Sequence, residues 1–372
     1  MHKTDLCVVG ASYAGLACAS AAVSNGLSVT VLEAKPEVGH RPHTTGILVQ
    51  EAVEQLPEIP ASLVRPVRGV RLYSPSLRSF DLFSDGYAFL AADTPGLLRW
   101  MADELLKKDN VTLRTRSRFQ GAEERADGLY LPEQDLLTRA LVGADGARSS
   151  VASHFGLGTN SEFLIGMEME FAGHAHLDER FLHVFVDSDL APGYIAWVVP
   201  GVGITQVGLA CRHPAHLSVE KLIEKLRPLC DFSTMQPLER RGGLIPVGGV
   251  VKPIAKNRAL IVGDAAGMVS PLTAGGIHKA LELGGLAGRA VAAHLGGGTQ
   301  SPEQALLAAS PHYRFKRQLR RVANYGVPNS LIEFTFGNSL FRRFAQLVFF
   351  HHRGLMTREG WGAALGKDGE DV

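Results

Sequence analysis

Two glycine-rich segments, far apart in the chain, constrain its fold more than any other feature. The first is G-A-S-Y-A-G at residues 10–15, which follows an apolar run at residues 6–9. The pattern predicts a buried strand at 4–10, a helix of small residues at 13–25 and a second strand at 27–32. A βαβ unit with a glycine turn before its helix is typical of dinucleotide-binding folds.

The residues of this turn have separate predicted roles. Gly10 permits the tight turn, and Gly15 lets the helix approach the strand, so that the helix N-terminus offers N–H groups to a diphosphate. Ser12 replaces the usual middle glycine. Its Cβ limits how closely the backbone can approach a phosphate, while its hydroxyl can donate to a phosphate oxygen. Glu33 ends the second strand, where it can accept hydrogen bonds from adenosine ribose hydroxyls. A tight turn in an unrelated α/β protein is the alternative.

The second segment is A-L-I-V-G-D-A-A-G at residues 259–267. Asp264 ends a predicted strand and is placed to accept from ribitol hydroxyls; a helix N-cap is the alternative. Gly275 and Gly276 leave the backbone close to a flat ligand, and a helix starting near Ile277 aims its positive end there. Two remote segments that close on one ligand predict FAD, because a flavin is held through repeated turnovers.

The bulk composition excludes several classes of protein. The 372 residues are 45% hydrophobic and 20% charged with a net charge of +1, which indicates a large core and no nucleic-acid partner. No apolar run reaches the roughly 18 residues of a spanning helix, and no secretory signal is present. The four cysteines (Cys7, Cys18, Cys211, Cys230) form no C-x-x-C pair, so buried free thiols and a cytoplasmic location are expected.

The middle of the chain predicts a mainly antiparallel sheet inserted between the two cofactor-binding parts. Its strand-like runs lie at 163–172, 181–186, 194–199 and 204–211. The expected fold is α/β (α+β overall): a Rossmann-like FAD-binding domain, an inserted antiparallel substrate domain and a C-terminal helical region. The predicted boundaries are 1–160 with 250–300, then 161–249, and then 301–372 with a disordered tail.

Three further motifs accompany the opening turn: H-T-T-G-I at 43–47, L-V-G-A-D-G-A-R-S at 141–149 and G-G-L-I-P-V-G-G at 242–249. Together with G-D-A-A-G-M-V-S-P-L-T-A-G-G-I at 263–277, they resemble the geranylgeranyl reductase family of FAD-dependent oxidoreductases, which is related to the aromatic-hydroxylase-like flavoproteins. The resemblance runs over roughly residues 4–295. The 263–277 stretch is its specific part, since many flavoproteins share the other motifs.

The motifs and the resemblance together give a set of predicted FAD-binding residues: Gly10, Ser12, Tyr13, Ala14, Gly15, Glu33, Ala34, Thr44, Thr45, Gly46, Asp145, Asp264, Gly267, Gly275, Gly276 and Ile277. Two positions depart from the family. Thr44 stands where relatives often have Cys, so no thiol can act there. Thr94 stands where relatives tend to carry Arg, and Arg99 on the predicted helix 97–106 is the candidate to compensate.

The substrate side is predicted from Y-I-A-W-V-V-P at 194–200, which resembles the family's Tyr-x-Trp-x-Phe-Pro motif with one added residue. Tyr194 and Trp197 are expected to line a slot for an apolar chain; packing in the core of the sheet is the alternative. No catalytic acid is assigned, although His43 and His278 flank the predicted pocket. No metal site is predicted, because the histidines, His40, His351 and His352 included, lack acids or thiols at ligand spacing.

Beyond residue 303 the chain is predicted to be helical and basic. Between residues 313 and 353 one acidic residue, Glu333, stands against eight basic ones: Arg314, Lys316, Arg317, Arg320, Arg321, Arg342, Arg343 and Arg353. Aromatic and aliphatic residues are interleaved with them. The pattern fits a helical cap that also touches an anionic membrane surface, and it fits a helix pair packed on the cofactor domain with a solvated basic face.

The resemblance implies reduction of C=C bonds in an isoprenoid lipid or prenyl chain by hydride transfer from reduced flavin. The alternative is an FAD-dependent monooxygenase of an apolar or aromatic molecule, which Thr44 makes more credible. A flavin- or lipid-binding protein without turnover is a third hypothesis. No second glycine-rich βαβ unit is visible, so NAD(P)H that docks transiently and a carrier such as ferredoxin both stay open as electron donors.

Overall fold

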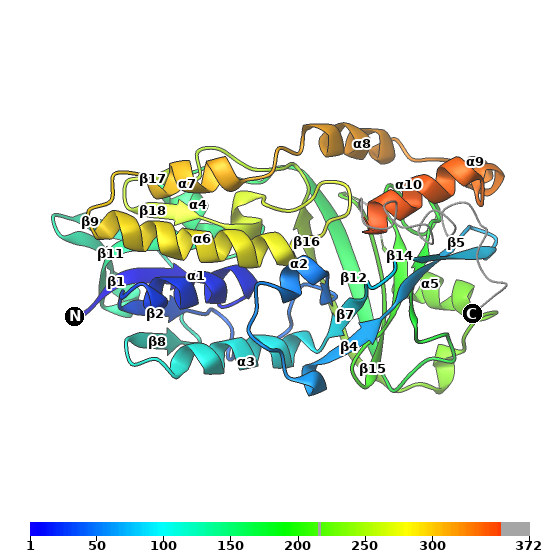
Figure 1. Cartoon of the computed structure of the whole chain (residues 1–372), viewed down its shortest axis with the longest axis horizontal. Coiled ribbons are helices and arrows are strands. Elements are labelled where there is room, and N and C mark those ends of the chain that lie inside the picture. The colour runs from blue at the N-terminus through cyan, green and yellow to red at the C-terminus, as the bar shows by residue number, and fades with distance from the viewer. Residues whose placement is uncertain (215–216, 351–372) are drawn as a thin grey trace.

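The structure is a computed structural model that describes residues 1–214 and 217–350. Two sheet-based lobes lie side by side, and three C-terminal helices run along one edge of the molecule (Figure 1). These helices are α8 (Arg314–Asn324), α9 (Asn329–Thr335) and α10 (Ser339–Phe350).

The first lobe is built on an eight-stranded sheet. Its strands are β1 (His2–Val9), β2 (Val29–Leu32), β8 (Val111–Arg114), β9 (Glu123–Arg125), β10 (Gly128–Leu131), β11 (Leu136–Gly143), β17 (Ala255–Lys256) and β18 (Ala259–Ile261). The order along the main path is β17-β18-β11-β1-β2-β8, and the five strands from β18 to β8 are parallel. This parallel arrangement confirms the predicted Rossmann-like half.

Helices α1 (Tyr13–Ser24) and α6 (Ile277–Leu295) pack against each other over this sheet. A Cβ on Gly284 would lie 2.4 Å from the carbonyl oxygen of Ala14, and one on Gly288 would lie 2.2 Å from that of Cys18. The two helix backbones therefore touch, and only glycine fits between them. This contact brings the start of α6 beside the first glycine turn, although the two segments are remote in sequence.

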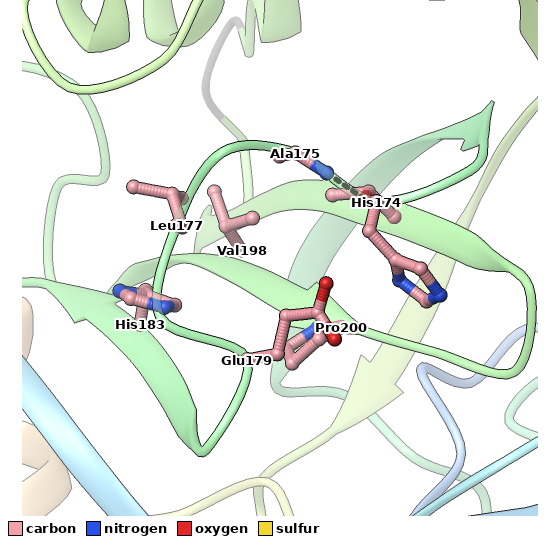
Figure 2. Close-up of a pocket in the computed structure, with 8 residues that line it drawn as sticks. His174, Ala175, Leu177, Glu179, His183, Val198 and Pro200 are labelled. Carbon is pink, nitrogen blue, oxygen red and sulfur yellow. Dashed lines mark hydrogen bonds between the residues drawn. The ribbon is translucent and has the colours of Figure 1, made fainter.

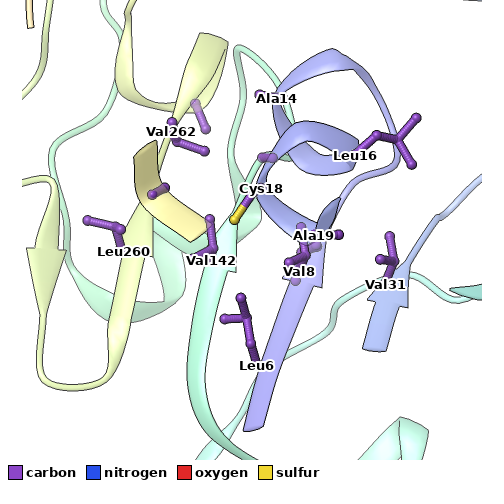
Figure 3. Packing of buried hydrophobic residues seen from close by; sticks show 14 of the residues in the cluster. Leu6, Val8, Ala14, Leu16, Cys18, Ala19, Val31, Val142, Leu260 and Val262 are labelled. Atoms are coloured by element: carbon purple, nitrogen blue, oxygen red, sulfur yellow. The ribbon is translucent and has the colours of Figure 1, made fainter. Parts of the chain in front are cut away.

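The core of this lobe lies between the helices and the parallel strands. Figure 3 shows Leu6, Val8 and Val142 on the strands, with Ala14 and Cys18 of α1 beside them. These side chains are buried, as the apolar runs of the sequence predicted. The four cysteines are buried and free, which confirms the expected free thiols.

The second lobe is built on a seven-stranded sheet in the order β16-β12-β15-β14-β13-β5-β6. Its strands are β5 (Gly69–Tyr73), β6 (Ser79–Phe83), β12 (Phe163–Ala172), β13 (Phe181–Phe185), β14 (Ala196–Pro200), β15 (Ile204–Arg212) and β16 (Pro237–Pro246). Neighbours are antiparallel except β13 and β5. The four strands that the sequence predicted in 162–250 are present, with ends that differ by no more than two residues.

Three strands of this sheet were not predicted: β5, β6 and β16. β5 and β6 come from residues that sequence analysis assigned to the cofactor domain, and β5 joins the edge of the inserted segment by pairing with β13. Pairing between strands more than 100 residues apart leaves no pattern in the sequence of either strand. The alternation of apolar and polar residues in each short strand is compatible with packing on any apolar surface.

The remaining described elements connect and cover the two lobes. A three-stranded sheet, β3-β7-β4, consists of β3 (Ile47–Leu48), β4 (Val64–Val67) and β7 (Phe89–Ala92). The other α-helices are α2 (Gln50–Val53), α3 (Thr94–Leu106), α4 (Ser150–Phe155), α5 (Val219–Leu226) and α7 (Pro302–Ala309).

The predicted C-terminal helical region is present as far as Phe350. His351, His352, Arg353 and the predicted tail lie outside the described residues. Within 1–214 and 217–350, no helix has the length and apolar character to cross a membrane.

The glycine contact between α1 and α6 generates a prediction. Gly284→Ala should lower the free energy of unfolding by about 1–3 kcal/mol, because its methyl group would overlap the Ala14 carbonyl and force the helices apart. Gly285→Ala is the matched control, since a Cβ there would meet only the end of the flexible Arg289 side chain at 3.3 Å. Denaturant unfolding of both variants checks this; equal destabilisation would show that the close contact is not decisive.

Candidate cofactor and substrate site

The glycine turn before α1 has the geometry that its sequence predicted. Gly10 has φ +103°, and a Cβ there would lie 2.4 Å from the carbonyl oxygen of Ala144. A Cβ on Gly15 would lie 1.8 Å from the carbonyl oxygen of Gly10, so α1 starts in direct contact with the turn. Ser12 is the N-cap residue of α1, and its side chain makes no capping hydrogen bond. The first N–H groups of α1 therefore face an open end that suits a diphosphate.

Glu33 ties the end of β2 to this turn. Its Oε2 accepts a hydrogen bond from the backbone N–H of Ala11 at 2.8 Å, and its Oε1 accepts one from Lys35 N–H at 2.8 Å. A carboxylate has about four lone-pair positions, so two are left for ribose hydroxyls. Glu33 thus has a structural role in the turn as well as its predicted role at the adenosine. Ala34 is exposed next to it.

The loop at 43–47 turns at Gly46, which has φ +76°. A Cβ on Gly46 would lie 2.1 Å from the hydroxyl of Thr94, the first residue of α3, which is only 1% exposed. Thr94 therefore packs directly beneath this loop, next to the buried Tyr13 of α1, whose pKa is raised by burial. Arg99 is exposed on α3, so it does not take the place of the family's Arg at position 94.

The second half of the predicted cofactor site begins at the short helix η4 (Gly263–Ala266), directly after β18. A Cβ on Gly263 would lie 2.9 Å from the Cβ of Ala14, so this turn touches the start of α1. Gly267 has φ +68° and lies against the carbonyl oxygen of Gly249. Gly276 is the N-cap of α6, which begins at Ile277 as predicted. The two glycine segments and two helix N-termini thus converge.

Asp264 lies at this convergence. No described residue donates a hydrogen bond to its carboxylate, whereas its backbone carbonyl accepts from Asn160 Nδ2 at 2.8 Å. A Cβ on Gly276 would lie 3.7 Å from its Oδ1, so the carboxylate faces the N-cap of α6. Burial without a cation or donor raises the pKa of Asp264 to about 6. An acceptor left without donors in this position fits a ligand that supplies hydroxyl groups, as the ribitol of FAD does.

Asp145 has a different role from the predicted one. Its carboxylate accepts four hydrogen bonds, from the hydroxyl of Ser149, the N–H and hydroxyl of Ser150, and the N–H of Val151. Oδ1 accepts one of these bonds and Oδ2 the other three, so the carboxylate serves chiefly to hold the start of α4. The Gly/Asp turn after β11 therefore caps a helix, a role that its sequence pattern does not distinguish from ligand binding.

A buried charged cluster, which the sequence did not predict, joins the 43–47 loop to the second sheet. Glu168 of β12 and Arg241 of β16 are 5% and 7% exposed. Arg241 donates to Glu168 Oε1 from Nη2 at 2.5 Å and from Nε at 3.1 Å. Glu168 Oε2 accepts from the hydroxyl of Thr45 at 2.9 Å and from the indole N–H of Trp197 at 2.9 Å. One carboxylate thus fixes the cofactor loop and the predicted substrate residue together.

The two predicted substrate residues have different surroundings. Tyr194 donates a hydrogen bond from its hydroxyl to the carbonyl oxygen of Thr273 at 2.5 Å, in the segment before α6. Trp197 lies against Gly208 of β15, where a Cβ would come within 2.5 Å of the indole ring, and it also packs against the core of the second sheet. Both side chains are half-buried, and their role at the substrate stays a prediction.

The histidines among residues 1–214 and 217–350 give no metal site and no assigned acid. His43 lies close to Gly243 of β16, and burial together with the charges of Lys35 and Arg241 lowers its pKa. His43 is therefore neutral at pH 7, which makes it a poor proton donor. No group of metal-ligating side chains is found within the described parts of the chain.

Two cavities of the described structure lie elsewhere. Figure 2 shows residues that line a cavity of about 10 Å³, among them Leu177, Glu179, His183, Val198 and Pro200. This volume has room for about one water molecule. A larger cavity of about 230 Å³ lies at the far end of α6, beside Leu295 and Lys256. Neither includes a predicted cofactor or substrate residue.

Comparison with known proteins decides the family. The model of an NAD(P)-binding Rossmann-like domain matches residues 8–54. A digeranylgeranylglycerophospholipid reductase of Methanothermobacter thermautotrophicus is 30% identical over 312 residues, which are 78% of each chain. The chain belongs to this family. A reductase of the same name from Methanosphaera stadtmanae is 29% identical over 77% of each chain. The predicted resemblance to geranylgeranyl reductases is thereby confirmed.

Solved structures confirm the predicted fold class. A geranylgeranyl bacteriochlorophyll reductase-like protein of Thermoplasma acidophilum superposes with a TM-score of 0.81 at 18% identity, covering 99% of this chain and 96% of that one. A p-nitrophenol 4-monooxygenase of Pseudomonas putida gives a TM-score of 0.68 at 16% identity, covering 95% and 98%. Likeness at such identities establishes the shared fold, and the reductases and monooxygenases have it in common.

The unpartnered carboxylate of Asp264 generates a second prediction. Because its pKa is raised from 3.8 to about 6, the folded protein holds this proton more tightly than the unfolded chain. The stability that the folded protein gains by holding this proton is fully present below pH 3.8, the pKa in the unfolded chain. It is lost as the pH rises through about 6, the pKa in the folded protein. Asp264→Asn should therefore raise the Tm of the ligand-free protein at pH 7 by about 2–4 °C. It should also weaken FAD binding by roughly tenfold or more.

Thermal unfolding at pH 4 and pH 7, and FAD titration at pH 7, check both parts of this prediction. Asp145→Asn is the matched control, since it should lower the Tm through the α4 cap and leave FAD affinity unchanged. Asp264→Asn with a lower Tm and unchanged FAD affinity would contradict the assignment of Asp264.

Proposed function

We propose that this protein is an FAD-dependent oxidoreductase that reduces C=C bonds in the prenyl chains of a lipid. The proposal rests chiefly on the family relationship over 78% of the chain and of the relative. The convergence of two remote glycine segments on the free carboxylate of Asp264 supports it from the side of the cofactor. FAD-dependent monooxygenases share the fold, but a probable FAD-dependent monooxygenase of Pseudomonas aeruginosa is 20% identical, whereas the reductase relative is 30% identical.

The proposed cofactor site uses the chain's own groups for binding. The N-terminus of α1 would hold the diphosphate, the free positions of Glu33 the adenosine ribose, and the Asp264 carboxylate the ribitol hydroxyls. The N-terminus of α6, preceded by Gly275 and Gly276, would face the ring system with its positive end. The chemistry supplied by bound, reduced FAD is hydride transfer to one carbon of the double bond.

The protein's further task is to hold an unpolarised double bond against the cofactor and to keep water away. Tyr194 and Trp197 are proposed to form the wall of that site. Trp197 is held by Glu168, which also holds Thr45 of the cofactor loop, so substrate wall and cofactor loop would keep a fixed separation. A fixed separation between the substrate wall and the cofactor loop favours hydride transfer over a short distance.

The electrons are proposed to come from an external donor, either NAD(P)H or a protein carrier such as ferredoxin. The Rossmann-like match at 8–54 covers the same βαβ unit that is proposed to hold FAD. It therefore adds no second nucleotide site to the chain.

Contact with a membrane surface is proposed for the C-terminal helices. Phe315, Phe334 and Leu340 are 72%, 86% and 72% exposed, which is unusual for large apolar side chains. Arg314 and Arg321 of α8 are exposed among them. Apolar side chains flanked by cations fit an anionic lipid surface, where the prenyl lipid substrate would also be found.

Anaerobic turnover tests the proposed function. The FAD-loaded protein, reduced by a low-potential donor, should convert a digeranylgeranylglycerol phospholipid to products that gain two hydrogen atoms per reduced bond, detected by mass spectrometry. Activity should persist without oxygen, and omission of the reductant is the control. Products that gain an oxygen atom, formed only in air, would instead identify a monooxygenase.

Vesicle flotation tests the membrane contact. Phe315→Ser/Phe334→Ser and Arg314→Gln/Arg321→Gln should each reduce binding to vesicles that contain anionic lipid, the former by losing buried apolar area and the latter by losing about 1 kcal/mol per cation. The matched control is Lys107→Gln/Arg125→Gln, which removes two exposed cations from the first lobe. Equal losses in the control would show that only net charge matters.

A further inference from the structure

We propose that Arg320, on the inner face of α8, is the binding site for the phosphate of a phospholipid headgroup. The inference rests on the proposed function and adds to it a residue and a chemical group. It assigns α8 two faces: an outer one toward the lipid surface and an inner one toward the headgroup of the bound lipid.

Arg320 is a buried cation whose charge is not balanced. Its residue is 2% exposed, its Nη2 donates to the carbonyl oxygen of Gly193, and its Nε and Nη1 are buried without any partner. Within the described residues no carboxylate forms an ion pair with it, and its other near neighbour is the Tyr194 ring, with the centroid 5.6 Å from Cζ. Water can satisfy N–H groups but not the charge, so a buried guanidinium of this kind calls for an anion.

The buried face of the helix that carries Arg320 is largely polar, and its exposed face mixes cations with apolar side chains. Tyr313, Lys316, Arg320 and Asn324 recur at helical spacing and are buried or half-buried, and the Oδ1 of Asn324 also lacks a partner. On the outer side, Phe315 and Val322, seven residues apart, are 72% and 63% exposed. Helices that cover a protein core bury their apolar face. An inner face of polar groups with unused hydrogen-bonding atoms therefore fits a polar ligand better than a core.

The place of α8 connects this face to the reaction site. The helix lies along the edge between the two lobes (Figure 1). Its residues Tyr313 and Arg317 lie against Gly249, and Ala323 and Asn324 lie against Gly193. Tyr194, which follows Gly193, donates to Thr273 in the segment that precedes α6. Arg320 is thus connected to the proposed flavin environment through one side chain, that of Tyr194.

A lipid phosphate fits this position better than other anions. The remaining N–H groups of Arg320 can donate to several oxygens of one phosphate, and Lys316 on the same face supplies a second cation. Burial lowers the pKa of Lys316, so its charge is also poorly solvated without an anion. The exposed Phe315 and Val322 would place the helix in the plane where phospholipid headgroups lie, and the relatives are named as reductases of a phospholipid.

Binding of matched soluble probes to the FAD-loaded protein tests this assignment. The probes are dihexanoyl phosphatidic acid, the diglyceride with the same saturated chains, and inorganic phosphate, each titrated by calorimetry. Wild type should bind the phosphatidic acid at least about tenfold more tightly than the diglyceride, as expected for charge-assisted hydrogen bonds. Arg320→Met should remove this preference, and Arg68→Met, which removes an exposed arginine between β4 and β5, should keep it.

Unfolding separates a binding role from a structural one. Because an unpaired buried charge is unfavourable, Arg320→Met should unfold at the same or a higher Tm than wild type without ligand, and only wild type and Arg68→Met should gain Tm with phosphatidic acid. A lower Tm together with lost binding would mean that Arg320 is structural and would overturn the proposal. Retained preference in Arg320→Met, or equal loss in Arg68→Met, would overturn it as well.

The remaining arms identify the source of the anion and keep the two proposals apart. Inorganic phosphate that binds as tightly as the phosphatidic acid would show a free-phosphate site and overturn the headgroup assignment. The probes carry saturated chains and no turnover is measured, so failure of C=C reduction and failure of this subsite are observed independently.

Discussion

The direct backbone contact between α1 and α6 is the constraint on which the cofactor site depends. A site for a long dinucleotide needs the glycine turn after β1 and the Gly-Asp turn after β18 to lie side by side, although most of the chain separates them. Gly284 and Gly288 let the helices touch, so the start of α6 lies where the start of α1 also points. Two helix N-termini then face one region, and their partial positive charges favour an anionic ligand there.

The close packing around the Gly-Asp turn also explains why no described residue donates a hydrogen bond to the Asp264 carboxylate. The turn that holds Asp264 touches Ala14 through Gly263, and the carboxylate faces Gly276, the N-cap of α6, which has no side chain to donate a hydrogen bond. The raised pKa of Asp264 is the cost of keeping an acceptor ready for a ligand. Functional sites often retain such locally unfavourable groups, because the ligand completes them.

Polar contacts join the second lobe to this site, in addition to the apolar packing of Ile47 and Val49. Glu168 receives hydrogen bonds from Thr45, Trp197 and Arg241, and Tyr194 reaches Thr273. A buried ion pair adds little net stability, since desolvation offsets most of its attraction. Its directional bonds do fix relative positions, which is what a site shared between a cofactor loop and a substrate sheet requires.

The sequence by itself determined the βαβ unit, the parallel cofactor half, four of the five strands within 162–250 and the start of α6, because each leaves a local pattern of period, glycine or charge. It also carried the family resemblance. Only the tertiary structure decided that Asp145 caps α4, that β5 and β6 join the second sheet, and that Arg99 faces solvent. The tertiary structure alone brought Glu168 to Thr45 and buried the Arg320 side chain on the inner face of α8. These outcomes depend on contacts between residues far apart in the chain. The local sequence around either partner does not reveal the energy of such a contact.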